Sequence, residues 1–154
     1  MKKILFVCYG NICRSPMAEA IMFHILKESN LSNQFYLESA ATSAEEIGSD
    51  IYYLAKQKLI EKGIHFGPRR ARQLRADDYD NFDYIIGMEM HNIYDIKNII
   101  GVDHNNKVMR LLDFSDYPRD ISDPWGTHRF EEAYNDIYEG CTAFLNYLKK
   151  DLND

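Results

Sequence analysis

The chain has 154 residues, of which 45% are hydrophobic and 27% charged, as is usual for one globular domain. The formal net charge of −6 gives an electric field that repels nucleic acid. No apolar run is long enough to cross a membrane, and the 3 cysteines and 5 histidines lack the spacing of a zinc site. We therefore expect a single domain over residues 1–154. It is expected to be cytoplasmic and monomeric, with no metal, cofactor, nucleic-acid or membrane partner.

The N-terminal segment predicts a strand, a loop and a helix. The continuous apolar run at residues 4–7 is typical of a strand buried on both faces at the centre of a parallel sheet. It leads directly into residues 8–15. Ser15 followed by Pro16 indicates a helix start, because serine can cap free N–H groups and proline is tolerated in the first turn. We expect this helix to run to about Ser29.

The rest of the chain repeats this alternation. Further strands are expected at residues 35–40, 84–88 and 108–112, and helices at 50–62, 89–99 and after Thr127. Ser49 is expected to cap the helix at 50–62 and Gly63 to end it. This alternation predicts an α/β fold with a four-stranded parallel sheet and helices on both faces. Ligands of such sheets bind beyond the carboxyl ends of the strands. The arginines within residues 69–75 are expected to be a solvated segment.

The loop after the first strand has the composition of an oxyanion site. Its backbone N–H groups can converge on an anion, which glycine and asparagine permit. The guanidinium of Arg14 matches two phosphate oxygens at once. The helix N-terminus and Arg14 favour the thiolate of Cys8, and Ser15 can donate its hydroxyl to that sulfur. The predicted phosphate-binding loop therefore starts at the nucleophile Cys8 and continues through Tyr9, Gly10, Asn11, Ile12, Cys13, Arg14 and Ser15.

The sequence resembles the low-molecular-weight protein tyrosine phosphatases. Their signature V-C-x-G-N-x-C-R-S-P occurs at residues 7–16, and similar segments continue to Asp123-Pro124, so the resemblance covers most of the chain. In that family a D-P motif supplies the general acid, which implies this role for Asp123. The resemblance implies hydrolysis of phosphotyrosine in proteins or peptides through a phosphocysteine on Cys8, with phosphate or other oxyanions held in the loop.

The pocket walls depart from the family pattern. Glu45 stands where relatives often place an aromatic residue, and Trp125 follows the D-P motif where tyrosine is usual. We expect Tyr9, Ile12, Glu45 and Trp125 to line the pocket. The alternative for Trp125 is a buried structural role, since tryptophan is commonly buried in cores.

The resemblance also implies how the loop is supported. Asn11, Ser15 and Ser39 are expected to brace it by hydrogen bonds. A histidine that often precedes the A-R-Q segment in relatives is missing, and Arg69 lies nearby. The resemblance suggests a protective disulfide between Cys13 and Cys8, and the alternative is a merely packed Cys13 thiol.

Three other functions are open on the same residues. Relatives that dephosphorylate arginine tend to carry threonine at the position of Ile12. The isoleucine in this sequence therefore favours phosphotyrosine over phosphoarginine as the substrate. An arsenate reductase would need a further pair of cysteines, and none lies between Cys13 and Cys141. A phosphopeptide-binding module would keep Arg14 but could lose the nucleophile or the acid, and both Cys8 and Asp123 are present.

Overall fold

A parallel sheet forms the centre of the structure, a computed structural model that describes residues 1–153. Strand β1 (Lys2–Cys8) pairs with β2 (Phe35–Ala41) on one side and with β3 (Tyr84–Gly87) on the other. Strand β4 (Val108–Arg110) pairs with β3, and every pairing is parallel. The strand order β2-β1-β3-β4 confirms the predicted sheet and places β1 inside it. The end of β1 is therefore held on both sides.

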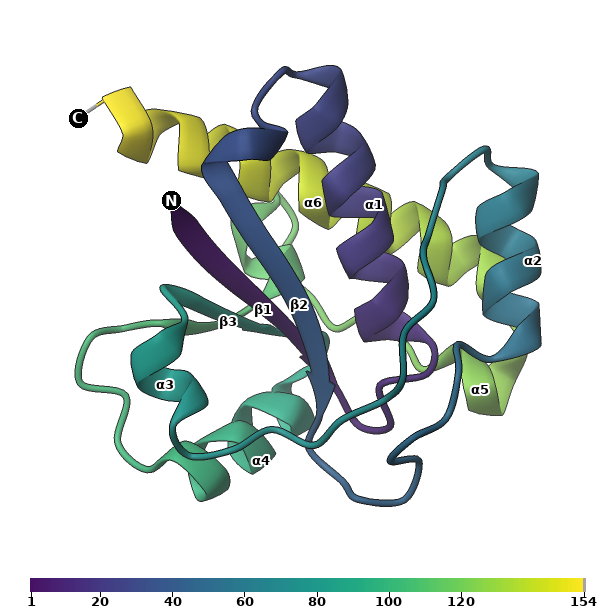
Figure 1. The fold of residues 1–154 in the computed structure, drawn as a ribbon, viewed down its shortest axis with the longest axis horizontal. Helices are drawn as coiled ribbons and strands as arrows, with labels where there is room; N and C mark the ends of the chain where they lie inside the picture. Colours follow the sequence, from purple (N-terminus) through teal and green to yellow (C-terminus); the bar gives the residue numbers. More distant parts are fainter. Residues whose placement is uncertain (154) are drawn as a thin grey trace.

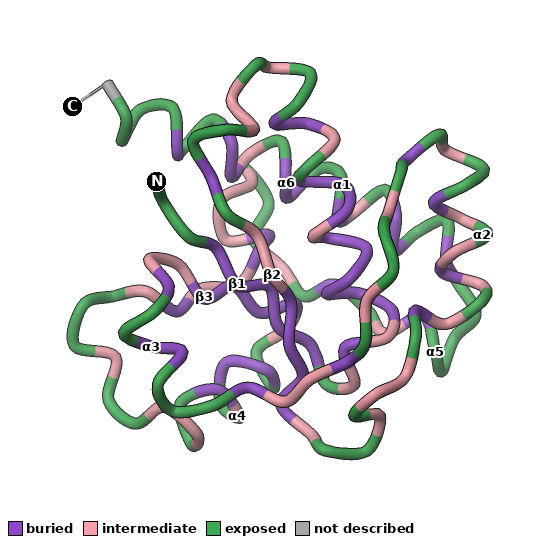
Figure 2. The backbone as a smooth tube through the Cα atoms, in the orientation of Figure 1, coloured by how far each residue is buried: buried purple, intermediate pink, exposed green. Residues whose placement is uncertain are grey.

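Helices cover both faces of the sheet (Figure 1). The helices α1 (Arg14–Glu28), α2 (Tyr53–Glu61) and α6 (Phe130–Asn153) share one hydrophobic core with Ile4 and Phe6 of β1. The helices α3 (Asp78–Asn81) and α4 (Met90–Ile100) lie on the other face, above Leu5 and Val7. Alternate residues of β1 thus face opposite layers, as expected of a strand. Figure 2 shows the resulting buried positions along β1 and the inner side of α1.

The start of α1 differs from the prediction. Cys13 is the N-cap and Ser15 already lies in the first turn, where it caps nothing. Its hydroxyl lies instead 3.0 Å from the sulfur of Cys8 and accepts a 2.8 Å hydrogen bond from the Asn11 amide. Pro16 is tolerated because the N–H groups of a first turn have no acceptor within the helix.

The start of α2 was also predicted wrongly, by three residues. Ser49 does not cap it; its hydroxyl donates to Glu46, and its backbone carbonyl accepts the N–H of Ala71 at 2.8 Å. This long-range pairing keeps the chain before Tyr53 extended. The predicted end is confirmed, since Gly63 follows α2 with φ of 72°, a conformation that favours glycine.

Several short elements were not predicted. They are α3, the 3₁₀ turns Ser32–Gln34 and Leu111–Phe114, and α5 (Pro124–Thr127). The last 3₁₀ turn replaces the end of the strand predicted at 108–112, because the Asp113 carboxylate accepts the Arg110 N–H at 2.9 Å. Helix α6 begins at Phe130, and Thr127 accepts the N–H of Arg129 just before it. None of the helices within residues 1–153 is long and apolar enough to cross a bilayer.

Candidate active site

Hydrogen-bond donors converge on the sulfur of Cys8, which ends β1 in the middle of the sheet. The backbone N–H of Asn11 lies 3.3 Å from the sulfur and that of Ser15 lies 3.4 Å from it. The hydroxyl of Ser15 is closer, at 3.0 Å. The side chain is buried, so these contacts act with little competition from water.

Asn11 holds the turn that creates this geometry. Its φ of 57° is left-handed, a conformation that asparagine tolerates better than most residues. Its side-chain oxygen accepts from the guanidinium of Arg69 and from the backbone N–H of Arg72. The amide nitrogen must then be the group that donates to the Ser15 hydroxyl at 2.8 Å. Ser15 is left with a hydrogen that it can donate to the sulfur of Cys8 at 3.0 Å, which is closer than its other acceptor, the Ala40 backbone oxygen at 3.5 Å.

Arg69 anchors this network, so the prediction of a solvated arginine segment is wrong at this position. It is partly buried and donates to the backbone oxygen of Asn11 at 2.8 Å and to the Ser39 hydroxyl at 3.3 Å. Ser39 in turn donates to Glu19 at 2.7 Å. Arg72 is also partly buried and pairs with Asp78 at 3.0 Å. The missing signal was long-range, since residues 69–72 and 11 meet only in the fold.

Arg14 lies almost completely buried, with 2% of its surface exposed. Its guanidinium donates to the backbone oxygen of Ile121 at 2.8 Å and lies 3.3 Å from the Glu89 carboxylate. Glu89 is the N-cap of α4 and lies two residues after the end of β3. Sequence reasoning placed it only at a helix start. Its position just beyond the carboxyl end of a strand was the available signal, because these ends share one edge of the sheet.

Asp123 faces the same guanidinium from a separate segment. One carboxylate oxygen lies 3.7 Å from Arg14, and the other accepts the N–H of Trp125 at 3.1 Å as the N-cap of α5. The side chain of Asp123 is 44% exposed. The structure thus brings the two distant sequence candidates, Arg14 and Asp123, to one place.

A cavity of about 160 Å³ opens above the loop. All four residues expected to form its walls do line it, and Glu46 joins them: Tyr9, Ile12, Glu45, Glu46 and Trp125. Trp125 is 52% exposed and packs edge-on against Tyr52, with ring centroids 4.7 Å apart. The alternative of a buried structural tryptophan is therefore wrong.

The two other thiols differ from Cys8 in their surroundings. Burial, together with the nearby Cys8 and Asp123, raises the pKa of Cys13 to about 12, so this thiol is neutral at physiological pH. Cys141 lies fully buried in α6, with its sulfur 3.8 Å from the Ala18 carbonyl oxygen. All three cysteines are free.

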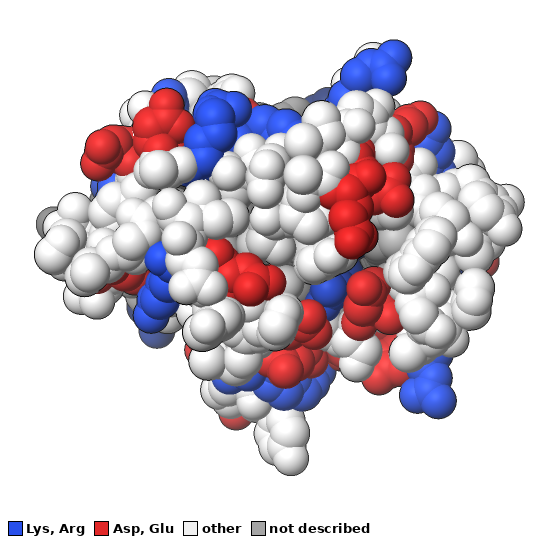
Figure 3. Space-filling model, turned by 90° about the horizontal axis from the view of Figure 1, so that it is seen from below, with Lys and Arg blue, Asp and Glu red and all other residues white. Residues whose placement is uncertain are grey.

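Acidic side chains lie around the cavity. Figure 3 views the side on which the strands end and shows Asp and Glu side chains there, with Lys and Arg side chains among them. Glu45 and Glu46 belong to this side and accept hydrogen bonds from Tyr9 and Ser49. Within residues 1–153 no group of three or more His, Cys, Asp or Glu side chains could hold a metal ion.

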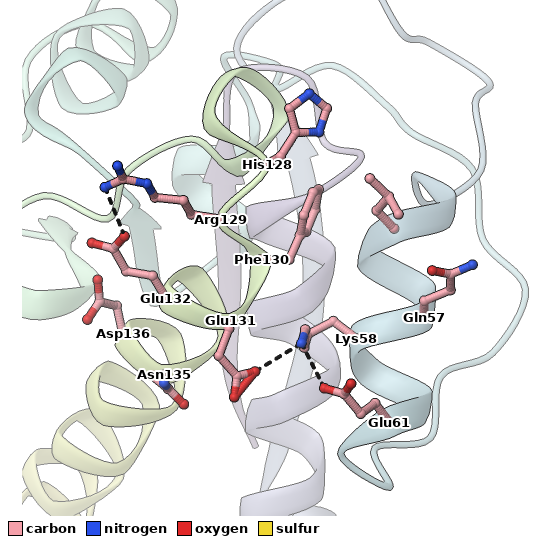
Figure 4. A pocket seen from close by; sticks show the side chains of 11 residues that line it. Gln57, Lys58, Glu61, His128, Arg129, Phe130, Glu131, Glu132, Asn135 and Asp136 are labelled. Atoms are coloured by element: carbon pink, nitrogen blue, oxygen red, sulfur yellow. Dashed lines mark hydrogen bonds and ion pairs between the residues drawn. The ribbon is translucent and has the colours of Figure 1, made fainter.

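A larger cavity, of about 870 Å³, lies between α2 and α6 (Figure 4). Its charged side chains form ion pairs: Lys58 pairs with Glu61 at 2.7 Å and with Glu131 at 3.0 Å, and Arg129 lies 3.7 Å from Glu132. It contains no nucleophile of the kind found above the loop. Size alone therefore does not mark the reactive site of this protein.

Comparison with known proteins agrees with this geometry. Residues 3–154 match the family model described as low molecular weight phosphotyrosine protein phosphatase. The low molecular weight protein-tyrosine-phosphatase YfkJ of Bacillus subtilis is 38% identical, over 98% of both chains. The enzyme PtpA of Staphylococcus aureus is 34% identical, over 99% of this chain and 97% of its own.

Solved structures agree as well. The crystal structure of YfkJ superposes with a TM-score of 0.93 and covers 98% of this chain and 96% of its own. The structure of a Drosophila arginine phosphatase is 31% identical, with a TM-score of 0.86, and covers 97% of this chain and 98% of its own.

Proposed function

This chain belongs to the low molecular weight phosphotyrosine protein phosphatase family and is a protein-tyrosine-phosphatase acting on phosphoproteins, and we propose that Cys8, Arg14 and Asp123 carry its reaction. The observation that supports this most directly is the set of donors on the Cys8 sulfur, from Asn11 and Ser15. Such donors stabilise a thiolate, which is the nucleophilic form of cysteine.

In the proposed first step, the phosphate of phosphotyrosine lies in the loop of residues 8–15. Loop N–H groups and the guanidinium of Arg14 hold its non-bridging oxygens, where charge persists in the transition state. The Cys8 sulfur forms a bond to phosphorus while the bond from phosphorus to the tyrosyl oxygen breaks. Asp123 gives its proton to that oxygen, so that a neutral tyrosine leaves.

In the second step, water attacks the phosphocysteine and the sulfur–phosphorus bond breaks. Asp123, now a carboxylate, takes a proton from the water and returns to its starting form. The hydroxyl of Ser15 lies 3.0 Å from the sulfur and stabilises the departing thiolate. Inorganic phosphate and a free Cys8 thiolate complete the cycle.

Glu89 acts as a positioning residue in this proposal. Its carboxylate lies 3.3 Å from the Arg14 guanidinium, which keeps the planar fork turned toward the phosphate. The backbone oxygen of Ile121 fixes the same group at 2.8 Å. With both partners in place, Arg14 loses little conformational freedom when the phosphate binds.

The alternative substrate is phosphoarginine, since one structural relative is an arginine phosphatase. Ile12 lines the cavity with an apolar side chain and has no hydroxyl that could bind a guanidinium, which favours phosphotyrosine. An arsenate reductase relay lacks support, because the remaining thiol, Cys141, is buried in the core against α1.

A cytoplasmic location is part of the proposal and is supported by the three free cysteines, which a reducing compartment preserves. The monomeric state, the single domain over residues 1–154 and the absence of nucleic-acid and membrane partners stay predictions. The Cys8–Cys13 disulfide is also a prediction.

Acid-quenched mass spectrometry of the enzyme with a phosphotyrosine peptide tests the proposed chemistry. We expect a phosphate adduct on Cys8, and a loss of kcat of at least about 10⁴-fold in Cys8→Ser. The matched control is Cys13→Ser, which removes a neighbouring thiol and is expected to keep its adduct on Cys8. Activity that survives Cys8→Ser would disprove the mechanism. A faster turnover of phosphoarginine than of phosphotyrosine peptides would favour the alternative substrate.

A further inference from the structure

The segment 42–50 contributes Glu45 and Glu46 to the walls of the cavity, but it supplies no aromatic ring. Residues 42–50 read TSAEEIGSD and contain no aromatic side chain. Of the described residues that line the cavity, the aromatic ones are Tyr9 and Trp125. Trp125 comes from α5 and packs on Tyr52, so its position is supported from behind. Tyr9 comes from the phosphate-binding loop itself and needs a different support.

That support comes from the segment 42–50. The backbone oxygen of Cys8 accepts the N–H of Thr42 at 2.9 Å, and that of Tyr9 accepts the N–H of Ser43 at 3.0 Å. The hydroxyl of Tyr9 then donates to the Glu45 carboxylate at 2.8 Å. The same segment therefore holds Tyr9 at its backbone and at the far end of its ring.

The bond from Tyr9 to Glu45 matters because it is the main polar contact of the tyrosine hydroxyl, which also interacts with the Ser43 side chain. The residue is 41% exposed, and no ring contact comparable to that of Trp125 with Tyr52 fixes it within the described residues. The hydrogen bond to Glu45 raises the pKa of Tyr9, so the hydroxyl stays a donor at physiological pH. A side chain fixed before binding loses less conformational entropy when the substrate arrives.

We infer that Glu45 is a positioning residue that holds Tyr9 as the second aromatic wall of the pocket, so that Tyr9 and Trp125 together select aryl phosphates. The inference rests on the proposed function, because it concerns how the phosphotyrosine ring is received. Phosphotyrosine presents a flat ring to these walls. The alkyl esters phosphoserine and phosphothreonine gain no ring stacking from them.

A double-mutant cycle on Tyr9 and Glu45 tests this role. Tyr9→Phe removes one oxygen, and Glu45→Ala removes the acceptor. Each is expected to raise KM for a phosphotyrosine peptide about 3- to 10-fold, with kcat within about 2-fold. The double variant should match a single one, because both changes break the same bond. Glu45→Gln keeps an acceptor oxygen and should lie close to wild type.

Two controls separate this inference from general damage. Tyr94→Phe changes another exposed tyrosine, outside the cavity lining, and should leave KM unchanged. Thermal unfolding of each variant reports whether the fold is kept, and Tyr9→Phe removes only one exposed hydroxyl. An unchanged KM in both single variants would overturn the inference. So would a double variant whose KM rises by the product of the single effects, or a loss confined to kcat.

The outcome also distinguishes this inference from the proposed function. A wild-type enzyme that fails to hydrolyse the phosphotyrosine peptide contradicts the proposed function itself. A wild-type enzyme that hydrolyses it through Cys8, while the Tyr9–Glu45 cycle shows no coupling, contradicts the positioning role alone.

Discussion

The phosphate-binding loop and the rim of the cavity above it are built in opposite ways. In the loop, Asn11 and Ser15 are fully buried and Arg14 nearly so, although all three are polar. On the rim, Tyr9 and Trp125 are large and aromatic, and both stay substantially exposed. The loop buries its polar groups because each has a partner, whereas the rim leaves apolar surface open for a ligand.

This difference predicts how far the effect of a single substitution should reach. Asn11 bonds to Arg69, Arg72 and Ser15, so a change in the loop disturbs a connected network. Such networks respond by more than the sum of their separate bonds. Tyr9 depends mainly on Glu45, so a change on the rim acts locally.

Among changes at Asp123, Arg69 and Glu46, Asp123→Ala is expected to have the largest effect. It tests whether an exposed residue of the rim can take part in the chemistry. Asp123 lies on the rim, but the proposed mechanism makes it the proton donor. We expect kcat for phosphotyrosine to fall about 10²- to 10⁴-fold. The loss should be smaller on para-nitrophenyl phosphate, whose leaving group needs less protonation. Steady-state kinetics of both substrates measures these losses, with a change at another exposed aspartate, Asp116→Ala, as the control. Equal losses of kcat on the two substrates would exclude Asp123 as the general acid.

Arg69→Ala is expected to have an intermediate effect and tests the connected network. Removing the guanidinium leaves the buried side-chain oxygen of Asn11 with fewer donors, which costs about 1–3 kcal/mol of unfolding free energy. We also expect kcat to fall about 10-fold, because the turn at Asn11 aims two donors at Cys8. Urea unfolding and kinetics measure both effects.

The neighbouring Arg70 supplies a matched control. It is exposed and donates to the backbone oxygen of Gly48, outside the Asn11 network. Arg70→Ala should change the unfolding free energy by no more than about 0.5 kcal/mol. Arg69→Lys keeps the charge but loses the planar fork, so it should restore activity only in part. Equal effects of the two alanine variants would mean that the loop is not braced by Arg69.

Glu46→Gln is expected to have the smallest effect. It tests whether the charge of the rim influences which peptide sequence is preferred. Glu46 lines the cavity together with Glu45, so a lysine beside the phosphotyrosine should be favoured over a glutamate. Neutralising Glu46 should reduce this preference about 2- to 3-fold, and less so at high salt. The ratio of kcat/KM for the two peptides measures it. The control Glu28→Gln, at the end of α1, should leave the ratio unchanged. If the preference for lysine survives Glu46→Gln, other residues are responsible for that preference.

The fold was largely predictable because its signals are local. The apolar run at residues 4–7 and the glycine after α2 each act within a few residues. The start of α2 was missed for the opposite reason. Ser49 precedes a helical segment as an N-cap does, but its backbone pairs with Ala71, which no local pattern reveals.

The residues of the site also differ in whether their signals in the sequence are local or long-range. The loop residues follow one another in the chain, so their chemistry could be recognised from spacing and residue type. Asp123 was assigned only through the family resemblance, since an Asp-Pro pair by itself indicates no more than a loop. Glu89 and Arg69 were missed or misjudged because their partners, Arg14 and Asn11, are about 75 and 58 residues away.

The rigidity of the braced loop has a consequence for turnover. A receptor whose donors are already in place binds any tetrahedral dianion of the right size, and it gains this affinity equally for substrate and product. Inorganic phosphate, released by the reaction itself, should therefore occupy the loop beside Asn11 and Arg14 and compete with the next phosphoprotein. The rim cannot prevent this product inhibition, because free phosphate carries no ring for Tyr9 or Trp125 to recognise. A high concentration of phosphate around the enzyme should therefore lower its rate of turnover.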